Sequence, residues 1–477
     1  MFRRSLLAGA AVLLVALVPA AQAESLLGLT IGFSGGADPY IATGDLSVDS
    51  PWIKRAQEEG AEMIRLDVTW STIAPTVRPA GFVASEPSSP GYDWTTLDAQ
   101  VRELSGAGFK ILVDVWGAPS WAEGPDQPRS APAGTWKPSP SAFGAFATAL
   151  ATRYSGSFAD PLSPLTDLPR VVDWQAWNEP NLATNLTPQW IRTSKGKLQA
   201  ESPIIDRKLQ NAFYMAVKHV SQSNLVIQGG TAPYGDPPGG QRIPPVDFDE
   251  DLFCLNSSLQ KLSCPDPVHL DALDHHPYGI YGPTWHALDP GDVAVPDIVK
   301  LTRVLHAAER VGTVLPRGPK QVWCTEISWD TKPPNPQAIP VVRAAHWLEQ
   351  SLYVLWSQGV DTVLWWQLAD SPPIPSYAVA YEAGVYFLDG RTKPGATAFR
   401  FPFLTNRVSP SLVEAWGRAP VSGTVSIEIL AHRNWRLATR LQVRADQVFQ
   451  AEMPLTGAES LRAQLAGKTS LAWNQGA

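Results

Sequence analysis

Short apolar runs alternate with longer amphipathic stretches over most of the chain, and this alternation constrains the fold more than any other feature. Eight runs have the length and composition of buried strands, namely residues 27–33, 62–68, 110–115, 171–177, 225–229, 270–275, 321–327 and 362–368. Helical periodicity fills several of the intervals, as in residues 96–107, 141–154, 207–222, 295–311 and 341–358. Strands that alternate with helices form parallel sheets, and eight such units close into a barrel. The sequence therefore predicts an α/β fold, a (β/α)8 TIM barrel.

The pattern changes after residue 402. Residues 424–429 read Thr-Val-Ser-Ile-Glu-Ile, the strict alternation of a half-buried strand, and no helical pattern is evident in this part. We therefore expect residues 24–402 to form the barrel and residues 403–477 to form a small C-terminal β-sandwich. Because the edge of the sandwich would lie close to the last barrel helix, a rigid structural appendage is favoured over a mobile binding module.

Residues 1–23 have the three parts of a secretory signal peptide. Arg3 and Arg4 give a basic start, residues 6–18 are apolar, and the segment ends in Ala-Gln-Ala, a small-residue cleavage site. The apolar run is too short to span a bilayer comfortably, which disfavours the alternative of a retained anchor. The paired arginines leave both the general and the twin-arginine export routes open. We expect a secreted protein, periplasmic or extracellular.

Charge and aromatic content narrow the function classes. With 38 Lys and Arg against 45 Asp and Glu, the net charge is −7, and no basic block stands out. This balance argues against a nucleic-acid binder or a sensor of anionic membranes. The 19 tryptophans outnumber the 15 phenylalanines and the 11 tyrosines, a surplus that fits a sugar-binding surface, although core packing also uses these rings. We expect a carbohydrate partner, no nucleic acid or membrane partner, and a monomer.

The three cysteines are Cys254, Cys264 and Cys324. The first two flank a nine-residue polar loop and are expected to pair in an oxidising compartment. Cys324 would then stay unpaired inside an apolar strand, as inert packing and not as a nucleophile. No His, Cys or Asp cluster has metal-ligand spacing, since the adjacent His275 and His276 stand alone. We therefore expect no metal and no organic cofactor.

Two glutamates end predicted barrel strands, where the reactive groups of such barrels lie. Glu179 lies in Trp-Asn-Glu-Pro-Asn after the fourth strand, and Glu326 lies in Thr-Glu-Ile-Ser-Trp at the end of the seventh. A single glutamate at such a place is more often a salt-bridged structural group. Two of them, each close to tryptophan, indicate paired carboxyl chemistry.

These two motifs resemble the retaining glycoside hydrolases of clan A, closest to family 39, with the family 5 cellulase-like enzymes next. The resemblance covers residues 26–400 and implies that Glu179 is the general acid/base and Glu326 the nucleophile. The physical requirements agree, because a retaining enzyme needs two carboxyl groups about 5–5.5 Å apart, one protonated and one ionised. The strand-seven motif departs from the Thr-Glu-Phe of many family 39 members, which leaves the substrate more open than the mechanism.

The resemblance also implies roles for polar neighbours. Asn178 would hydrogen-bond the 2-hydroxyl of the sugar, with a turn-capping role as the alternative. Arg65 matches the arginine that keeps the nucleophile ionised, and an arginine in an apolar run needs a buried anion. A purely structural ion pair with Asp67 or Asp114 is the alternative.

His276 and Tyr278 match the His-x-Tyr of the clan, in which the tyrosine hydroxyl contacts the nucleophile, and His275 is expected to be a core imidazole. On the eighth strand, the Trp-x-Leu-x-Asp motif of the clan makes Trp366 the platform under the sugar. Simple alternation instead places Trp365 on the inner face; we favour Trp366. Trp116, Trp70, Trp121 and Trp329 follow other strands, where they are candidates for further sugar subsites, with core packing as an equal alternative for each. Trp116 is assigned to substrate binding.

Together these features predict a secreted retaining glycoside hydrolase that cleaves a β-linked poly- or oligosaccharide. Two alternatives share its residues, a transglycosylase that passes the sugar to another sugar and a catalytically dead barrel that binds carbohydrate. A pure binder has no need of both Glu179 and Glu326, which disfavours the second. A metal-dependent barrel hydrolase lacks candidate ligands at the strand ends. The glycan and the choice between endo and exo action stay open.

Overall fold

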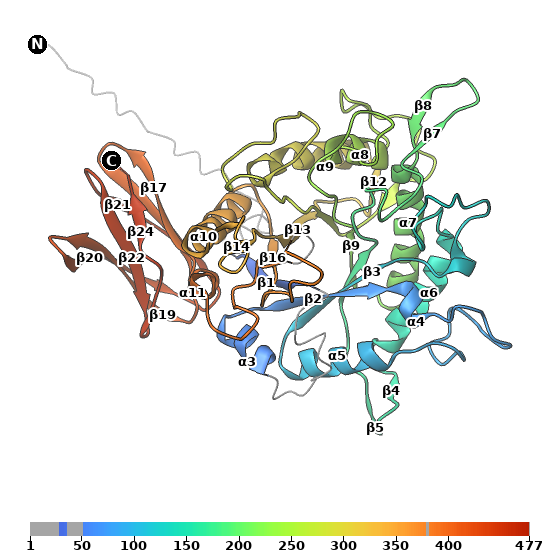
Figure 1. Cartoon of the computed structure of the whole chain (residues 1–477), viewed down its shortest axis with the longest axis horizontal. Coiled ribbons are helices and arrows are strands. Elements are labelled where there is room, and N and C mark those ends of the chain that lie inside the picture. Colours follow the sequence, from blue (N-terminus) through green and yellow to red (C-terminus); the bar gives the residue numbers. More distant parts are fainter. Residues whose placement is uncertain (1–27, 36–50, 378–380, 477) are drawn as a thin grey trace, which may run out of the picture.

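The computed structural model describes residues 28–35, 51–377 and 381–476. Its centre is a closed barrel of parallel strands, in which each strand pairs with the next barrel strand and the last pairs with the first (Figure 1). The strands are β1 (Thr30–Ser34), β2 (Met63–Thr69), β3 (Lys110–Trp116), β6 (Asp173–Ala176), β9 (Leu225–Gln228), β11 (Ala272–Asp274), β13 (Gln321–Ile327) and β16 (Thr362–Trp366). All eight predicted strands are present, so the TIM barrel is confirmed. The predicted signal peptide lies outside the described residues.

Each barrel strand is followed by a longer helix among the described residues: α3 (Pro51–Glu58), α5 (Thr95–Gly106), α6 (Pro140–Arg153), α7 (Ser202–Val220), α8 (Pro245–Leu252), α9 (Ile298–Val311), α10 (Val341–Ser357) and α11 (Pro394–Arg400). A short helix, α4 (Trp70–Ile73), precedes α5, and a 3-10 turn, η2 (Val295–Asp297), precedes α9. Helix α7 begins at Ser202 and not at residue 207, because Pro203 in its first turn has the fixed φ that suits a helix start.

Short two-stranded sheets lie in the connections. They pair β4 (Ala159–Asp160) with β5 (Ser163–Asp167), β7 (Trp190–Arg192) with β8 (Leu198–Ala200), β10 (Val268–His269) with β12 (Val314–Leu315), and β14 (Thr331–Lys332) with β15 (Ile339–Pro340). The β7–β8 hairpin projects from the barrel beside α7 (Figure 1). Because β7–β8 and β14–β15 follow barrel strands directly, they belong to the carboxyl end of the barrel, where a site is expected.

Inside the barrel the side chains form two layers of opposite character. The apolar layer, nearer the amino ends of the strands, comprises Met63, Leu112, Ile227, Ala272, Trp323 and Leu364. The polar layer lies one step toward the carboxyl ends and comprises the buried residues Arg65, Asp114, Gln175, Asp274 and Thr325. Side chains two positions apart on a strand share a face, so both sets point into the barrel.

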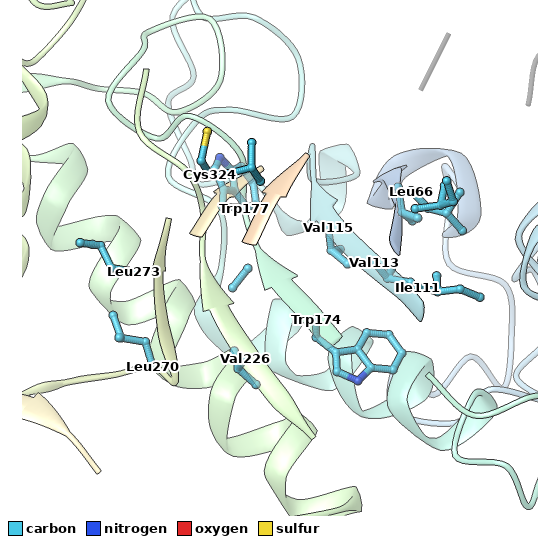
Figure 2. Close-up of a cluster of buried hydrophobic side chains, with 14 of the residues drawn as sticks. Leu66, Ile111, Val113, Val115, Trp174, Trp177, Val226, Leu270, Leu273 and Cys324 are labelled. Carbon is cyan, nitrogen blue, oxygen red and sulfur yellow. The ribbon is translucent and has the colours of Figure 1, made fainter. Parts of the chain in front are cut away.

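The alternate strand residues point outward and form the main core under the helices. Figure 2 shows part of this core, in which Ile111, Val113 and Val115 of β3 lie with Trp174 of β6 and Val226 of β9. The alternation of the strands thus separates a dry outer core from an interior that becomes polar toward the carboxyl end.

Residues 403–476 form two antiparallel sheets and no helix, as predicted. One sheet has the order β17-β18-β21, and the other has the order β20-β19-β22-β23 with β24 paired to β22. The strands are β17 (Phe403–Ser409), β18 (Leu412–Arg418), β19 (Gly423–Ala431), β20 (Asn434–Val443), β21 (Val448–Pro454), β22 (Glu459–Leu465), β23 (Lys468–Thr469) and β24 (Trp473–Gln475). Buried side chains of both sheets share one apolar cluster, which includes Phe403, Val413, Val425, Ile427 and Leu461.

These C-terminal sheets pack closely on the barrel beside α10 and α11 (Figure 1). The buried guanidinium of Arg418 donates to the carbonyl of Leu29 at 2.9 Å and forms an ion pair with Glu62. Trp416 contacts two aromatic rings of α10 at centroid distances of 5.6 and 5.8 Å. Buried charges and rings at the junction favour the rigid attachment that the sequence suggested.

The cysteine predictions are confirmed. Cys254 and Cys264 form a disulfide in the connection after α8, with their Cα atoms 5.6 Å apart. Cys324 is unpaired and buried, and burial raises the pKa of its thiol, so it stays protonated as part of the core. Among the helices of the described residues, none combines the length and apolarity needed to cross a bilayer.

Candidate active site

Glu179 is held at the carboxyl end of β6 by an unusual backbone. Trp177 and Glu179 have φ values of 73° and 42°, in the left-handed region that residues with side chains rarely adopt. The N–H of Glu179 donates to the carbonyl of Gly230 at 2.9 Å, and Nε1 of Trp177 donates to the carbonyl of Asn185 at 3.0 Å. The resulting turn places Glu179 in a hollow of about 310 Å³ at the barrel mouth, the catalytic hollow, which Glu326 also lines.

Glu326 lies near the end of β13 with both carboxylate oxygens occupied. Its Oε1 accepts from Nη1 of Arg65 at 2.6 Å, and its Oε2 accepts from the hydroxyl of Tyr278 at 3.0 Å. One carboxylate oxygen of Glu326 lies within 4.8 Å of one of Glu179. The structure therefore brings the two predicted glutamates together and fixes the orientation of one of them.

Arg65 is the cation of the polar layer and is fully buried. Its Nη1 lies 2.8 Å from Asp67, and its Nη2 lies 2.9 Å from Asp114. Nη2 also donates to the side-chain oxygen of Asn178 at 3.0 Å. Burial acts to lower the pKa of Arg65, but the carboxylates of Asp67, Asp114 and Glu326 raise it, so the guanidinium stays charged. Arg65 thus forms ion pairs both with Glu326 and with Asp67 and Asp114, and its effect on the ionisation of Glu326 stays a prediction.

His276 lies between the two glutamates. Its Nδ1 is 3.1 Å from Oε1 of Glu179 and 3.8 Å from Oε2 of Glu326, and its Nε2 is 3.0 Å from the hydroxyl of Thr325. Burial acts to lower the pKa of His276, but the charge of Glu326 and the hydrogen bonds to Asp274 and Glu179 raise it to about 10. The ring is therefore an imidazolium at neutral pH, and its charge offsets the repulsion between the two carboxyl groups.

Asp274, at the end of β11, supports this arrangement from the polar layer. It accepts from the N–H of Thr325 at 3.0 Å and from its hydroxyl at 2.5 Å. Burial acts to raise the pKa of Asp274, but its hydrogen bond to His276 lowers it, so it is ionised. A Cβ on Gly230 would lie 2.3 Å from Nε2 of His276 and 2.5 Å from Oδ2 of Asp274. The missing side chain of Gly230 is thus what lets these two groups approach.

His275 is the core imidazole that the sequence predicts. Its Nδ1 is 2.8 Å from the hydroxyl of Thr231, and its Nε2 is 3.0 Å from the carbonyl of Val293. Burial lowers the pKa of His275 to about 4, so the ring is neutral at pH 7. His275 and His276 directly follow β11, and their side chains have different partners, which is why two neighbouring histidines differ so much.

The two tryptophans of β16 also face opposite ways. Trp365 is 3% exposed, belongs to the outer core and donates from Nε1 to the carbonyl of Ala383 at 2.9 Å. Trp366 is half-buried, and its ring centroid lies 5.6 Å from that of Tyr381, which lines the catalytic hollow. The placement of Trp365 on the inner face by alternation is therefore wrong, because Leu364 of the apolar layer shares its face with Trp366.

The other predicted subsite tryptophans have different surroundings. Trp70 is fully buried and stacks on Phe146 at 5.4 Å, and Trp329 is 7% exposed. Their assignment to subsites is wrong, because both rings fill the core between strand ends and helices. Trp121 is half-buried and donates from Nε1 to a loop carbonyl at 2.8 Å. Trp116 ends β3 half-buried and is not among the described residues that line the catalytic hollow, so its contact with substrate stays a prediction.

Glu179, His276 and Glu326 also form a trio of potential metal ligands, with donor atoms within 4.8 Å of one another in the described part of the chain. Both ring nitrogens of His276 already make hydrogen bonds, Nδ1 to Glu179 and Nε2 to the Thr325 hydroxyl. A metal ion bound by the trio would therefore replace the contact between His276 and Glu179.

Sequence reasoning missed several residues of the site. Gln175 and Asp274 stand in apolar strands, and a polar residue in a buried strand was the available signal. Tyr234, Arg242 and Tyr381 line the catalytic hollow from loops after β9 and β16, where no periodicity marks a residue as functional.

The chain is similar in structure to several solved glycosidases. A family 39 glycoside hydrolase from Bacteroides cellulosilyticus shares 18% sequence identity, with 91% of this chain and 82% of that chain covered and a TM-score of 0.54. A glucosidase from Croceicoccus marinus shares 13% identity over 89% of this chain and 93% of that chain, with a TM-score of 0.49. A monomeric β-xylosidase from Caulobacter crescentus shares 16% identity over 90% and 94%, with a TM-score of 0.48.

No family model and no curated protein sequence matches the chain. The similarity to the family 39 structure extends over most of both chains. It confirms the predicted resemblance at the level of the fold.

Proposed function

We propose that this protein is a retaining glycoside hydrolase that cleaves a β-linked poly- or oligosaccharide. The observation that carries the proposal is the pair Glu179 and Glu326, with carboxylate oxygens within 4.8 Å of each other at the barrel mouth. Retaining glycosidases hold their two carboxyl groups about 5–5.5 Å apart, whereas inverting ones leave about 6.5–9.5 Å for a water molecule. The short separation supports double displacement.

Glu326 acts as the nucleophile. Its carboxylate attacks the anomeric carbon and forms a covalent glycosyl-enzyme while the glycosidic C–O bond breaks. Arg65 and Tyr278 donate to its two oxygens and present the carboxylate in one orientation. Asn178, hydrogen-bonded to Arg65, binds the 2-hydroxyl of the sugar, and Trp366 provides the platform beneath it.

Glu179 acts first as acid and then as base. It gives its proton to the leaving oxygen in the first step, and in the second step it takes a proton from water. The water oxygen attacks the anomeric carbon and releases Glu326 with its carboxylate restored. His276, 3.1 Å from Glu179, holds the acid/base in position through both steps.

The remaining parts of the chain have supporting roles in this proposal. Residues 1–23 direct export, residues 24–402 form the catalytic domain, and residues 403–477 form a β-sandwich accessory domain. The chain's own carboxyl groups carry out the reaction, and the protein works as a monomer on a carbohydrate substrate.

The first test incubates the purified mature protein with xylan, β-glucan, arabinan, galactan and bacterial exopolysaccharides, and identifies the products by mass spectrometry. Glu326→Ala serves as the inactive control. Products from the wild type alone support the proposal and name the glycan, with a ladder indicating endo action and a monomer indicating exo action. Binding without cleavage would favour the carbohydrate-binding barrel instead.

The second test concerns the role of Glu326. Glu326→Ala is expected to lower turnover on the order of 10⁴-fold, because the covalent route is lost. Azide should then restore cleavage of an activated aryl glycoside and yield the α-glycosyl azide. Glu58→Ala, which changes an exposed glutamate of α3, is the matched control. Turnover of Glu326→Ala close to that of wild type, or a β-glycosyl azide, contradicts the assignment.

A transglycosylase differs in what accepts the sugar from Glu326. Adding xylobiose or cellobiose to the reaction separates the two activities. A hydrolase releases free sugar at an unchanged rate, whereas a transglycosylase forms longer products at the expense of free sugar.

A further inference from the structure

A second hollow, of about 270 Å³, opens at the same end of the barrel as the catalytic hollow. Its walls come from the connections after β3, β6 and β9, three neighbouring barrel strands. The residues that line it include Trp136, Thr187, Trp190 and Gln241. Loops at the carboxyl end of such a barrel carry its ligand contacts. The second hollow is therefore in a place where substrate can reach it.

The two hollows share a wall. Leu182 and Arg242 line the catalytic hollow, and their chain neighbours Ala183 and Gln241 line the second hollow. Leu182 and Arg242 form an antiparallel bridge, and the N–H of Ala183 donates to the carbonyl of Gln241 at 2.8 Å. One pair of chain segments thus separates the hollows, so a chain-like ligand that crosses this wall occupies both.

Trp136 is held in the second hollow as a fixed flat surface. Its Nε1 donates to the carbonyl of Pro125 at 2.9 Å, and its backbone forms a β-bridge with Thr187. The N–H of Lys137 donates to the carbonyl of Thr187 at 2.9 Å, which secures the same segment a second time. The indole is half-buried, with the Lys137 ammonium 4.9 Å from the ring centroid.

These groups suit a sugar. The C–H face of a pyranose ring packs on an indole, and its hydroxyls take hydrogen bonds from nearby polar groups. The exposed residue Gln241, which lines the second hollow together with Trp136, supplies an amide for such a hydrogen bond. Because the loops hold the indole in place before binding, little ordering has to accompany the contact.

Glu179 indicates which part of the substrate lies here. The connection after β6 that carries Glu179 continues through Ala183 and Thr187 to Trp190, all of which line the second hollow. Glu179 protonates the leaving oxygen in the proposed reaction, so the leaving part of the substrate lies on the side of this connection.

We infer that the second hollow is a subsite for a sugar residue on the leaving side of a β-linked oligo- or polysaccharide. The direction of the bound chain rests on the proposed function. The protein thus acts on chains long enough to reach from Glu326 past the shared wall to Trp136, and small glycosides are poorer substrates.

The test compares Trp136→Ala with wild type on two substrates. One is the hexasaccharide of whichever panel polysaccharide is cleaved, and the other is the 4-nitrophenyl glycoside of the same sugar, whose leaving group is a single small ring. Trp136→Ala is expected to lose on the order of tenfold more kcat/KM on the hexasaccharide than on the aryl glycoside, mainly through KM. Trp136→Phe keeps a ring and should recover most of the loss.

Trp435→Ala is the matched control, since it removes a half-buried indole from β20 of the C-terminal sheets. It should leave the ratio of the two kcat/KM values unchanged. An unchanged ratio in Trp136→Ala, with cleavage intact, overturns the subsite and leaves the glycosidase standing. Equal losses on both substrates together with a lowered melting temperature show a structural role for Trp136 and overturn the subsite as well.

A binding assay keeps the two proposals apart. Glu326→Ala and the double variant Glu326→Ala/Trp136→Ala are run through gels that contain each polysaccharide of the panel. If the polysaccharide slows the migration of Glu326→Ala but not that of the double variant, the result supports the subsite even when wild type cleaves nothing. Equal retardation of both variants overturns it, and the absence of both retardation and cleavage overturns the subsite and the glycosidase together.

Discussion

The two layers inside the barrel share the strands β2, β3, β11 and β13 and differ in what they do. On β2, Met63 belongs to the apolar layer and Arg65, two residues on, to the polar layer; on β3, Leu112 and Asp114 stand in the same relation. The apolar layer fills the barrel by close packing. The polar layer pairs buried charges of opposite sign and brings Arg65 to 2.6 Å from Glu326. The layer that stabilises the barrel by packing and the layer that holds Glu326 are therefore only two residues apart along the strands.

The polar layer is stable because its charges are paired. A lone buried charge costs several kcal/mol, and partners with good geometry offset that cost. Arg65 serves three carboxylates, and His276 contacts both glutamates. Outside the barrel, Asp206 and Asp249 show the opposite case, since both are buried and three of their four carboxylate oxygens lack a hydrogen-bond partner in the described structure.

Arg65→Met is expected to have the largest effect among variants of the two layers. It leaves buried carboxylates without their cation, so the free energy of unfolding should fall by about 3–5 kcal/mol, and turnover should fall because Glu326 loses its donor. Urea unfolding and kcat/KM on the identified glycan measure both effects. The control is Arg391→Met, whose ion pair with Asp389 is exposed, so its loss should change the free energy of unfolding far less. Equal stability losses in the two variants would mean that the buried ion pairs of the polar layer stabilise the fold no more than the control ion pair does.

Leu364→Ala tests the apolar layer. Truncating a buried leucine should lower the free energy of unfolding by about 2–5 kcal/mol through lost burial and a residual cavity. Because the polar layer separates Leu364 from the glutamates, kcat/KM measured well below the melting temperature should stay within about twofold of wild type. A loss of activity as large as that of Arg65→Met would show that the layers are coupled.

Asp249→Asn is expected to have the smallest effect and the opposite sign. Burial raises the pKa of Asp249 to about 7, and the charge of Asp249, added to burial, raises the pKa of Asp206. The unfolded chain releases the proton near pH 4, so the wild type loses stability as the pH rises from about 4 to about 7. The variant lacks this loss and keeps an oxygen to accept from Gln228, which donates to Asp249 at 3.0 Å.

The melting temperature of Asp249→Asn should therefore exceed that of wild type by about 2–4 °C at pH 8, and the gain should vanish toward pH 4. Asp98→Asn is the control, because Asp98 accepts from Arg153 at 2.7 and 2.6 Å and its neutral variant should be destabilised at both pH values. A pH-independent difference between Asp249→Asn and wild type would refute the titration.

Local patterns predicted the barrel and much of the site. The eight strands, the disulfide and the core role of His275 follow from alternation, spacing and residue type, and the structure has all of them. The sequence also indicated that Arg65 needs a buried anionic partner, and in the structure it forms ion pairs with Glu326 and with two aspartates. The tryptophans were harder, because an indole serves a sugar and a core equally well. Trp70 and Trp329 are core rings that sequence alone placed in subsites.

The helices and strands, and the residues that end them, follow from the local pattern, since periodicity and strand ends depend on neighbours along the chain. Which of those residues come into contact depends on how the barrel closes. The left-handed turn at Trp177 and Glu179 and the approach of His276 and Asp274 over Gly230 depend on backbone geometry between strands far apart in the sequence. Such contacts produce no periodic pattern in the sequence, because the residues come close to one another only once the barrel has closed.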